Sequence, residues 1–362
     1  MNTPRHDLAD ARQTMPSDGG VVGSPGSPDA RWEVRRALRT CLSDIPPKSL
    51  VLVACSGGPD SLALAAAAGE EQGCARALPL RFGAAIVDHG LQEGSDAVAE
   101  HAGEACRGFG LDPVIVLRVR PAAGPGAGGP EAAARDARRA ILSETAAQQG
   151  AHVVLLAHTR DDQAETVLLR LARGSGARSL SGMPTADGIW RRPLLDMPRE
   201  IVRASLGATP AWSDPHNLDP RFTRSRVRAD VIPALVRSLG PAAVESLARS
   251  ARLLRDDADA LDEWAEARWV EMVCEPTVGQ LRLEVEALAA LPRAVRTRIL
   301  RRACLACGSP ATDLTFEHVT RVEALVSDWH GQGALDLPGL VSVHRECGSL
   351  YFSPDRGSAR GH

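Results

Sequence analysis

The sequence has few aromatic residues and almost no lysine. Phe, Trp and Tyr make up 3% of the 362 residues, so Leu, Val and Ala must fill the core. Lys48 is the only lysine, which excludes a Walker A loop, because that motif needs Gly-Lys-Ser/Thr. Positive charge is therefore nearly all arginine, a side chain suited to bidentate contacts with phosphate. The net charge of -3 argues against indiscriminate binding of nucleic acid.

Long apolar runs and a dense cysteine pattern are also missing. No apolar run is long enough to span a membrane, so we expect no membrane partner. Residues 1–30 lack the apolar core of a signal peptide. The eight cysteines form no disulfide framework, which favours a cytoplasmic location. Cys304 and Cys307 are expected to be buried free thiols, because a second Cys-x-x-Cys is missing.

One stretch combines a short apolar strand, a glycine turn and a helix. Leu50–Ala54 is predicted to be a buried strand and Ser61–Ala68 a helix. Glycines let backbone N–H groups approach an anion, and the helix N-terminus adds partial positive charge. We therefore predict a phosphate-binding loop made by Ser56, Gly57, Gly58, Pro59, Asp60 and Ser61.

Strand and helix patterns alternate through the first half of the chain. The predicted strands are Leu50–Ala54, Phe82–Val87, Pro113–Val119 and Val153–Ala157. Helices are predicted near Ser95–Gly108, Glu131–Gln149 and Asp161–Arg173. This alternation predicts an α/β fold with a doubly wound, mainly parallel sheet, and such sheets bind ligands at the carboxyl ends of their strands. Polar residues follow three of the strands, at Ser56–Ser61, Asp88-His89 and His158–Asp162.

Two groups of charged residues carry the chemistry that ATP requires. Asp60, Asp161 and Asp162 are candidates for holding Mg²⁺, which bridges phosphate oxygens. Acidic residues in a first helical turn are also good helix caps, so that alternative stays open. Arg135 and Arg138 lie three residues apart on one helix face, where they either neutralise phosphate or form a solvated surface.

The long segment AHTRDDQAETVLLRLARGSG at 157–176 and the SGGPDS loop at 56–61 come in a fixed order along the chain. With them the sequence resembles the PP-loop ATP pyrophosphatases and, among them, the tRNA(Ile)-lysidine synthetase family, for which the long segment is the most diagnostic. The match covers roughly residues 50–235. Its other segments are VDHGL at 87–91, EAAARDAR at 131–138, GMP at 182–184, RPLL at 192–195 and N-x-D-x-x-F-T-R-x-x-x-R at 217–228.

The resemblance implies a ligase that uses ATP and Mg²⁺ to join free lysine to a tRNA. ATP would adenylate C2 of the wobble cytidine in tRNA(Ile) with a CAU anticodon, and the lysine amine would then displace AMP. It implies that the 56–61 loop holds ATP, with Asp60 and Asp161 near the metal. Arg135, His158 and Asp162 would lie at the reacting centre. The tRNA and substrate surface would include Arg138, Arg173, Asn217, Arg224 and Arg228.

Composition and resemblance together divide the chain into five segments. We expect disordered tails at 1–30 and 355–362 and a catalytic ATP-binding domain at 31–235. A helical linker at 236–275 and a small α+β domain for tRNA or substrate at 276–354 complete the division. The oligomeric state stays open, with a homodimer as one expectation. Two positions depart from the family pattern, Gln92 and Arg139.

Two other enzyme classes and a binding module without activity are the alternatives to the ligase. A tRNA thiolase would need cysteines near the ATP site, where Cys55 looks solitary. An amidotransferase-type synthetase would need a glutaminase domain, and a nucleotide- or RNA-binding module without activity would not need the intact loop. Arginines at 221–228 and 293–302 suit backbone phosphates or form an ordinary charged surface.

Overall fold

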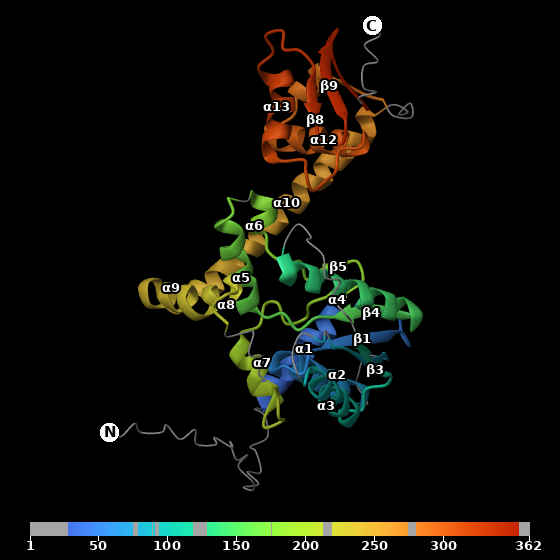
Figure 1. Ribbon diagram of the computed structural model, residues 1–362, viewed down its shortest axis with the longest axis vertical. Coiled ribbons are helices and arrows are strands. Elements are labelled where there is room, and N and C mark those ends of the chain that lie inside the picture. Colours follow the sequence, from blue (N-terminus) through green and yellow to red (C-terminus); the bar gives the residue numbers. More distant parts are fainter. Residues whose placement is uncertain are drawn as a thin grey trace, which may run out of the picture. The chain divides into compact units, whose positions relative to one another are not determined.

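The computed structural model describes most of the chain and separates it into two compact units (Figure 1). Unit 1 comprises the described parts of Met1–Glu165 and Pro184–Gly240, and unit 2 those of Thr166–Met183 and Pro241–His362. For residues 129–134 only the backbone is described. The described ranges are 28–74, 79–88, 90, 94–118, 129–174, 176–212, 219–273 and 280–354.

The predicted segments and the two units have different boundaries. The tails expected at 1–30 and 355–362 lie outside the described residues, except for 28–30, which begin the first helix. Most of the predicted ATP-binding segment 31–235 lies in unit 1, whereas residues 166–183 cluster with unit 2. Between residues 182 and 220, where the sequence reads as loop, the structure has two short strands and a helix.

Unit 1 is built on a six-stranded sheet in the order β3-β2-β1-β4-β6-β5. Every neighbouring pair is parallel except the short β5–β6 hairpin. The predicted α/β class with a mainly parallel sheet is therefore confirmed. The strands are β1 (Leu50–Cys55), β2 (Arg81–Asp88), β3 (Val114–Arg118), β4 (Ala151–Leu155), β5 (Ala186–Asp187) and β6 (Trp190–Arg191).

The central strand β1 explains why the sheet has two covered faces. Alternate side chains of a strand point to opposite faces, and all six residues of β1 are buried. Val51, Val53 and Cys55 join the core formed with α1, α2, α3 and α7. Leu50, Leu52 and Ala54 join a second core formed with α4. A continuous apolar run is what a strand buried on both faces requires.

The helices of unit 1 follow the strands in the predicted alternation. The sheet-covering helices are α1 (Pro28–Cys41), α2 (Pro59–Gln72), α3 (Ser95–Gly108), α4 (Gly129–Gln148) and α7 (Arg199–Leu206). α5 (Arg160–Leu171) follows β4. The remaining helices are α8 (Thr223–Arg226), the π-helix η2 (Val227–Val231) and α9 (Ile232–Leu239).

Unit 2 contains a four-stranded antiparallel sheet in the order β7-β10-β9-β8. It packs with helices around one apolar core, which confirms the predicted small α+β region. The strands are β7 (Leu281–Glu284), β8 (Leu335–Leu337), β9 (Val341–Glu346) and β10 (Ser349–Pro354). The helices are α6 (Ala177–Leu180), α10 (Ala243–Met272), α11 (Val285–Ala289), α12 (Arg293–Ala306) and α13 (Phe316–Ser327).

Three arginines of α12 form ion pairs with carboxylates of unit 2. Arg296 pairs with Glu323, Arg298 with Asp262 and Arg302 with Glu266. These contacts favour the ordinary charged surface over a phosphate-binding cluster. On the same helix, the Cys304 thiol is buried and Cys307 is half-buried. Burial raises the pKa of Cys304 to about 12, as expected for an unreactive thiol.

No single helix in the described ranges is both long and apolar enough to cross a bilayer. Only Thr223–Leu239 and Ala243–Met272, taken together as a broken pair, meet the length and composition criteria.

A buried carboxylate joins α1 to α2. Glu71 is 0% exposed and accepts hydrogen bonds from Arg35 Nε at 2.6 Å and Arg39 Nε at 2.7 Å. Its neighbour Glu70 is 36% exposed and lies 3.5 Å from Arg31 and 3.6 Å from Arg35. The two acids therefore offer a matched comparison of a buried and an exposed ion pair.

We expect Glu71→Gln to lower the free energy of unfolding by about 2 kcal/mol, because it removes two charge-assisted hydrogen bonds from a buried position. Glu70→Gln is the control and should change it by less than about 0.5 kcal/mol. Thermal and urea unfolding of the three proteins measure both effects. Equal effects of the two substitutions would contradict the buried-pair account.

Candidate active site

The turn after β1 is shaped to leave backbone N–H groups open to an anion. Gly57 has φ +77°, a backbone conformation that favours glycine over residues with a Cβ. α2 then begins with Pro59, whose missing N–H costs nothing at this position. The N–H groups of the first turn of a helix have no partners within the helix. The predicted phosphate loop therefore has the expected strand–turn–helix geometry.

The two serines of the loop have different surroundings. Ser61 is buried, and its Oγ donates to Gly58 O at 2.9 Å and accepts from Ser56 N at 3.1 Å. Ser61 therefore closes the turn internally. Ser56 is exposed, and its hydroxyl lies 3.3 Å from Ser61 Oγ. Across the turn, Trp212 N donates to Gly57 O at 3.0 Å, so the segment after α7 covers the loop.

The residues after β4 build the start of α5. Thr159 and Asp162 form a reciprocal cap, in which Asp162 Oδ2 accepts from the backbone N and the hydroxyl of Thr159, both at 2.8 Å. Asp162 N in turn donates to Thr159 Oγ1 at 3.5 Å. This is the Thr-x-x-acid arrangement that satisfies the first turn of a helix. The helix-cap reading of Asp162 thus holds for one of its carboxylate oxygens.

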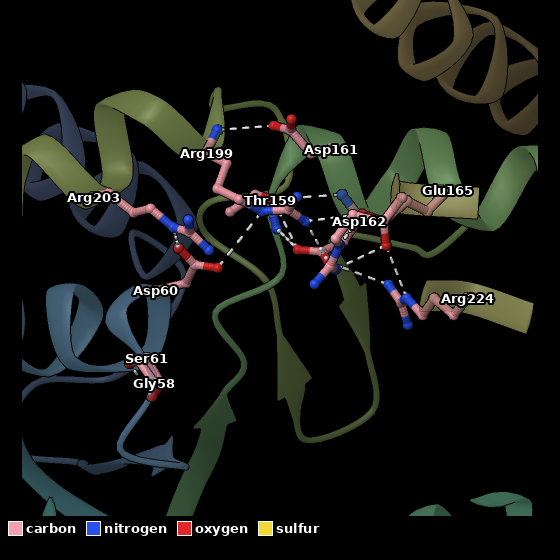
Figure 2. A network of polar contacts seen from close by, with 11 residues as sticks. Gly58, Asp60, Ser61, Thr159, Asp161, Asp162, Glu165, Arg199, Arg203 and Arg224 are labelled. Carbon is pink, nitrogen blue, oxygen red and sulfur yellow. Dashed lines mark hydrogen bonds and ion pairs between the residues drawn. The ribbon is translucent and has the colours of Figure 1, made fainter. Parts of the chain in front are cut away.

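The other oxygen of Asp162 belongs to a cluster of three arginines and two carboxylates (Figure 2). Asp162 Oδ1 accepts from Arg199 at 2.9 Å, Arg228 at 3.1 Å and Arg224 at 3.3 Å. Glu165 is buried one helical turn later and accepts from the same three side chains at 2.7–3.1 Å. The cluster joins α5 to α7 and to the α8–η2 segment.

This cluster keeps both carboxylates ionised. Burial opposes ionisation of Asp162, but Arg199 and Arg224 outweigh it, so the pKa of Asp162 lies well below its usual range. Burial also opposes ionisation of Glu165, but the Arg228 hydrogen bonds and the charges of Arg224 and Arg228 together outweigh it and lower its pKa. A carboxylate with a lowered pKa is a poor proton acceptor near neutral pH. Asp162 is therefore suited to recognising positive charge rather than to accepting a proton.

Asp60 and Asp161 meet the same cluster through α7. Asp60 Oδ1 accepts from Arg203 Nε at 3.1 Å, and its Oδ2 lies 3.7 Å from Arg199 Nε. Burial nevertheless raises the pKa of Asp60 above its usual value. Asp161 Oδ2 accepts from Arg199 N at 2.9 Å, which caps the first turn of α7. Asp60 and Asp161, two of the three predicted metal candidates, thus have arginine partners here.

His158 lies between β4 and this cluster. Its Nδ1 is buried and has no hydrogen-bond partner among the residues that the structure describes. Burial lowers the pKa of His158 to about 3, and although Asp162 raises it, the charges of Arg224, Arg192 and Arg135 lower it further. The ring is therefore neutral at physiological pH. This orphaned buried nitrogen follows β4, the neighbour of β1 in the sheet, and is available for a hydrogen bond with a ligand.

The arginines of α4 divide into different roles. The side chain of Arg135 is exposed, and its charge is near enough to His158 to affect the imidazole. Burial lowers the pKa of Arg138, whose charge acts on Cys55 at the end of β1. Arg139 instead pairs with Asp187 at 3.2 Å and lies over the Trp190 ring. Arg139, which departs from the family pattern, therefore has structural partners of its own.

The remaining predicted residues lie in unit 2, outside the described residues or in other contacts. Arg173 belongs to unit 2, where its side chain is exposed, and His89 and Asn217 lie outside the described residues. Arg221 pairs with Asp219 at 2.6 Å. Arg226 donates to the backbone oxygens of Pro220 and Arg221.

Three residues at the site were missed from the sequence: Glu165, Arg199 and Arg203. Glu165 stands in the AHTRDDQAET segment, and its position one turn after Asp162 was the available signal. Arg199 and Arg203 lie in the segment expected to be loop, so nothing indicated that they share a helix face. Cys55 is also not solitary, because the thiol of Cys106 on α3 is near enough to lower its pKa.

The donor set is compatible with Mg²⁺ held mainly by a nucleotide. In the described part of the chain, no three His, Cys, Asp or Glu residues are grouped to bind a metal by themselves. Mg²⁺ at phosphate sites usually takes only one or two carboxylates besides phosphate oxygens and water. Asp60 is a hard oxygen donor at the second position of α2, beside the loop. The residues therefore fit a site that phosphate completes.

Comparison with known proteins agrees with this geometry. A PP-loop domain model matches residues 31–235, and a TilS substrate binding domain model matches residues 283–351. The tRNA(Ile)-lysidine synthase of Thermobifida fusca is 54% identical over 91% of this chain and 99% of its own length. This chain belongs to the tRNA(Ile)-lysidine synthase family. The Streptomyces coelicolor member is 53% identical over 84% of this chain and 86% of its own length.

A solved structure outside the family shares the fold. The U34-tRNA thiolase NcsA from Methanococcus maripaludis, described with its [4Fe-4S] cluster, has a TM-score of 0.51. It is 20% identical and covers 63% of this chain and 80% of its own. That identity supports a common fold and nothing about activity. Lysidine synthase relatives of about 50% identity therefore decide between the ligase and thiolase readings.

We expect His158 to make stability depend on pH. Its folded pKa of about 3 lies below the unfolded value of 6.5, so below pH 6.5 the unfolded chain binds a proton that the folded chain does not. Stability is then lost as the pH falls. From pH 7.5 to 5.5, His158→Asn should lose about 1 kcal/mol less unfolding free energy than the wild type.

Urea unfolding at the two pH values measures this difference. His101→Asn is the control, because the His101 side chain is 62% exposed, and it should follow the wild type. If His158→Asn and the wild type lose the same free energy, the imidazole is not held neutral by burial.

Proposed function

We propose that this protein is an ATP-dependent ligase that forms lysidine at the wobble cytidine of tRNA(Ile) with a CAU anticodon. ATP adenylates C2 of the cytidine with release of diphosphate, and lysine then displaces AMP. The observation that carries the proposal is the close relationship to tRNA(Ile)-lysidine synthases over nearly the whole chain. The intact phosphate loop beside an ionised carboxylate–arginine cluster supports it.

The loop supplies the ATP site in this proposal. Backbone N–H groups at the turn and at the start of α2 bind the phosphates, while Gly57 and Gly58 keep space for close approach. Asp60 is the residue proposed to hold Mg²⁺, with Asp161 as a second candidate. When bound, the cation would neutralise charge on the diphosphate leaving group. The internal hydrogen bonds of Ser61 keep the turn in shape.

Arginines from α4 are placed to act on the adenylation step. The C2 oxygen of cytidine attacks the α-phosphorus, the bond from that phosphorus to diphosphate breaks, and negative charge develops on the phosphate oxygens. Arg135 is proposed to face the adenylate or the base, and Arg138, near Cys55, to neutralise charge. Fixed positive groups that await developing charge are an efficient form of catalysis.

The second step needs a recognised and deprotonated amine. The lysine nitrogen forms a bond to C2, the bond from C2 to the AMP oxygen breaks, and the nitrogen loses a proton. We propose that Asp162 recognises a positively charged group of lysine, because its pKa is too low for it to be the base. His158 is proposed to orient the substrate through its orphaned Nδ1. Arg224 and Arg228 hold Asp162 and border the substrate.

The proposed partners are free lysine and the tRNA. The match of residues 283–351 to a TilS substrate binding domain supports a substrate-binding role for the C-terminal part of unit 2. We place the reaction in the cytoplasm, because ATP, lysine and tRNA occur together there, and propose no membrane partner. The homodimer stays a prediction.

The deciding test supplies ATP, Mg²⁺, tRNA(Ile) with a CAU anticodon and radiolabelled lysine to the purified protein. We expect label to enter the tRNA only when ATP is present, with release of AMP. A methionine tRNA with the same anticodon is the control and should remain unlabelled. Transfer of sulfur or another amine in place of lysine would overturn the ligase assignment.

Asp60→Ala should lower this ATP-dependent transfer by about 100-fold or more, because it removes the carboxylate proposed for the metal. The far-ultraviolet circular dichroism should stay unchanged. Asp44→Ala is the matched control, since Asp44 is 63% exposed and pairs with Arg191. Wild-type transfer by Asp60→Ala would defeat the assignment of Asp60.

A further inference from the structure

Arg203 differs from the other arginines near the phosphate loop. Its side chain is 52% exposed, and its Nε donates to Asp60 Oδ1 at 3.1 Å. Its two terminal nitrogens have no partner in the part of the chain that the structure describes. By contrast, one terminal nitrogen of Arg199 and one of Arg228, the Nη2 atom in each, donate to both Asp162 and Glu165. Arg203 therefore has donors to offer a ligand.

The position of Arg203 makes phosphate the natural ligand. It lies on α7 one turn after Arg199, and both arginines approach Asp60 at the start of α2 (Figure 2). The open backbone N–H groups of the phosphate loop lie at the same end of α2. A guanidinium with free N–H groups at such a place can form a bidentate bond to phosphate oxygens.

The Asp60 carboxylate is needed by both Arg203 and the proposed Mg²⁺. In the structure its carboxylate is the partner that holds Arg203 beside the loop. In the proposed function the same carboxylate holds Mg²⁺ bound to ATP. The carboxylate can then no longer neutralise Arg203 fully, and the guanidinium needs another anion. The phosphates that arrive with the cation supply it.

We propose that Arg203 binds the diphosphate portion of ATP, and that Asp60 positions it for this contact before the nucleotide arrives. The inference rests on the proposed function, because it assumes that ATP occupies the loop. It adds a specificity residue for the leaving diphosphate. The opposite possibility is that Arg203 only shields Asp60 from the cation, and that possibility predicts tighter nucleotide binding when Arg203 is removed.

The test measures equilibrium binding of ATP, inorganic pyrophosphate and AMP, each with Mg²⁺, by isothermal titration calorimetry. Arg203→Ala should raise the Kd for ATP and for pyrophosphate about tenfold, the usual scale for a lost charge-assisted hydrogen bond. The Kd for AMP should stay within twofold of the wild-type value. Arg203→Gln, which keeps a polar stem, should give the same pattern and guards against a folding defect in the alanine variant.

Arg249→Ala is the matched control, because Arg249 is 53% exposed and pairs only with Glu245 on α10 among the described residues. It should leave all three affinities unchanged. Unchanged or tighter ATP binding by both Arg203 variants overturns the proposal, and equal weakening of AMP overturns the assignment to the diphosphate. Lysine transfer by the wild type is assayed in parallel, so that failure of the proposed function is seen separately from failure of the Arg203 contact.

Discussion

Two buried carboxylates that share three arginines hold the candidate active site together. Asp162 and Glu165 lie one turn apart on α5, and their partners come from α7 and from the α8–η2 segment, up to 66 residues away in sequence. Removing one member would leave a buried charge without compensation, which typically costs about 3–5 kcal/mol. The cluster therefore explains why α7 and the α8–η2 segment lie beside α5. It also explains why both carboxylates stay ionised in a buried place.

The cluster connects to the phosphate loop through α7. Asp161 caps the first turn of that helix, Arg199 joins it to the cluster, and Arg203 reaches Asp60 at the start of α2. The loop is placed independently by β1, whose side chains enter two separate cores. The phosphate loop is therefore positioned by β1 and the ionised cluster by α5, and α7 contacts both. This arrangement suits a two-step reaction. ATP chemistry needs positively charged groups and recognition of the amine needs negatively charged groups, and both kinds of group must lie side by side.

Much of the fold was predictable because it depends on local patterns. The apolar run of β1, the glycine turn and the alternation of strands with helices all appear in short windows of sequence. The sheet order follows from few alternatives, since parallel strands need helical crossovers. The segment of residues 182–220 was not predictable in the same way. Its strands have only two residues each, and α7 follows a proline-rich stretch with no cap signal except Pro198.

The sequence by itself determined the glycine turn after β1 and the parallel sheet, because strand periodicity and the loop motif are local. Only the tertiary structure decided which charges meet. Whether Arg224 and Arg228 face solvent or carboxylates, and whether Arg199 and Arg203 approach Asp60, depends on packing between distant segments. The pKa of His158 depends on burial and on charges from three other segments. Electrostatic interactions act through space, so their partners are found only once the chain has folded.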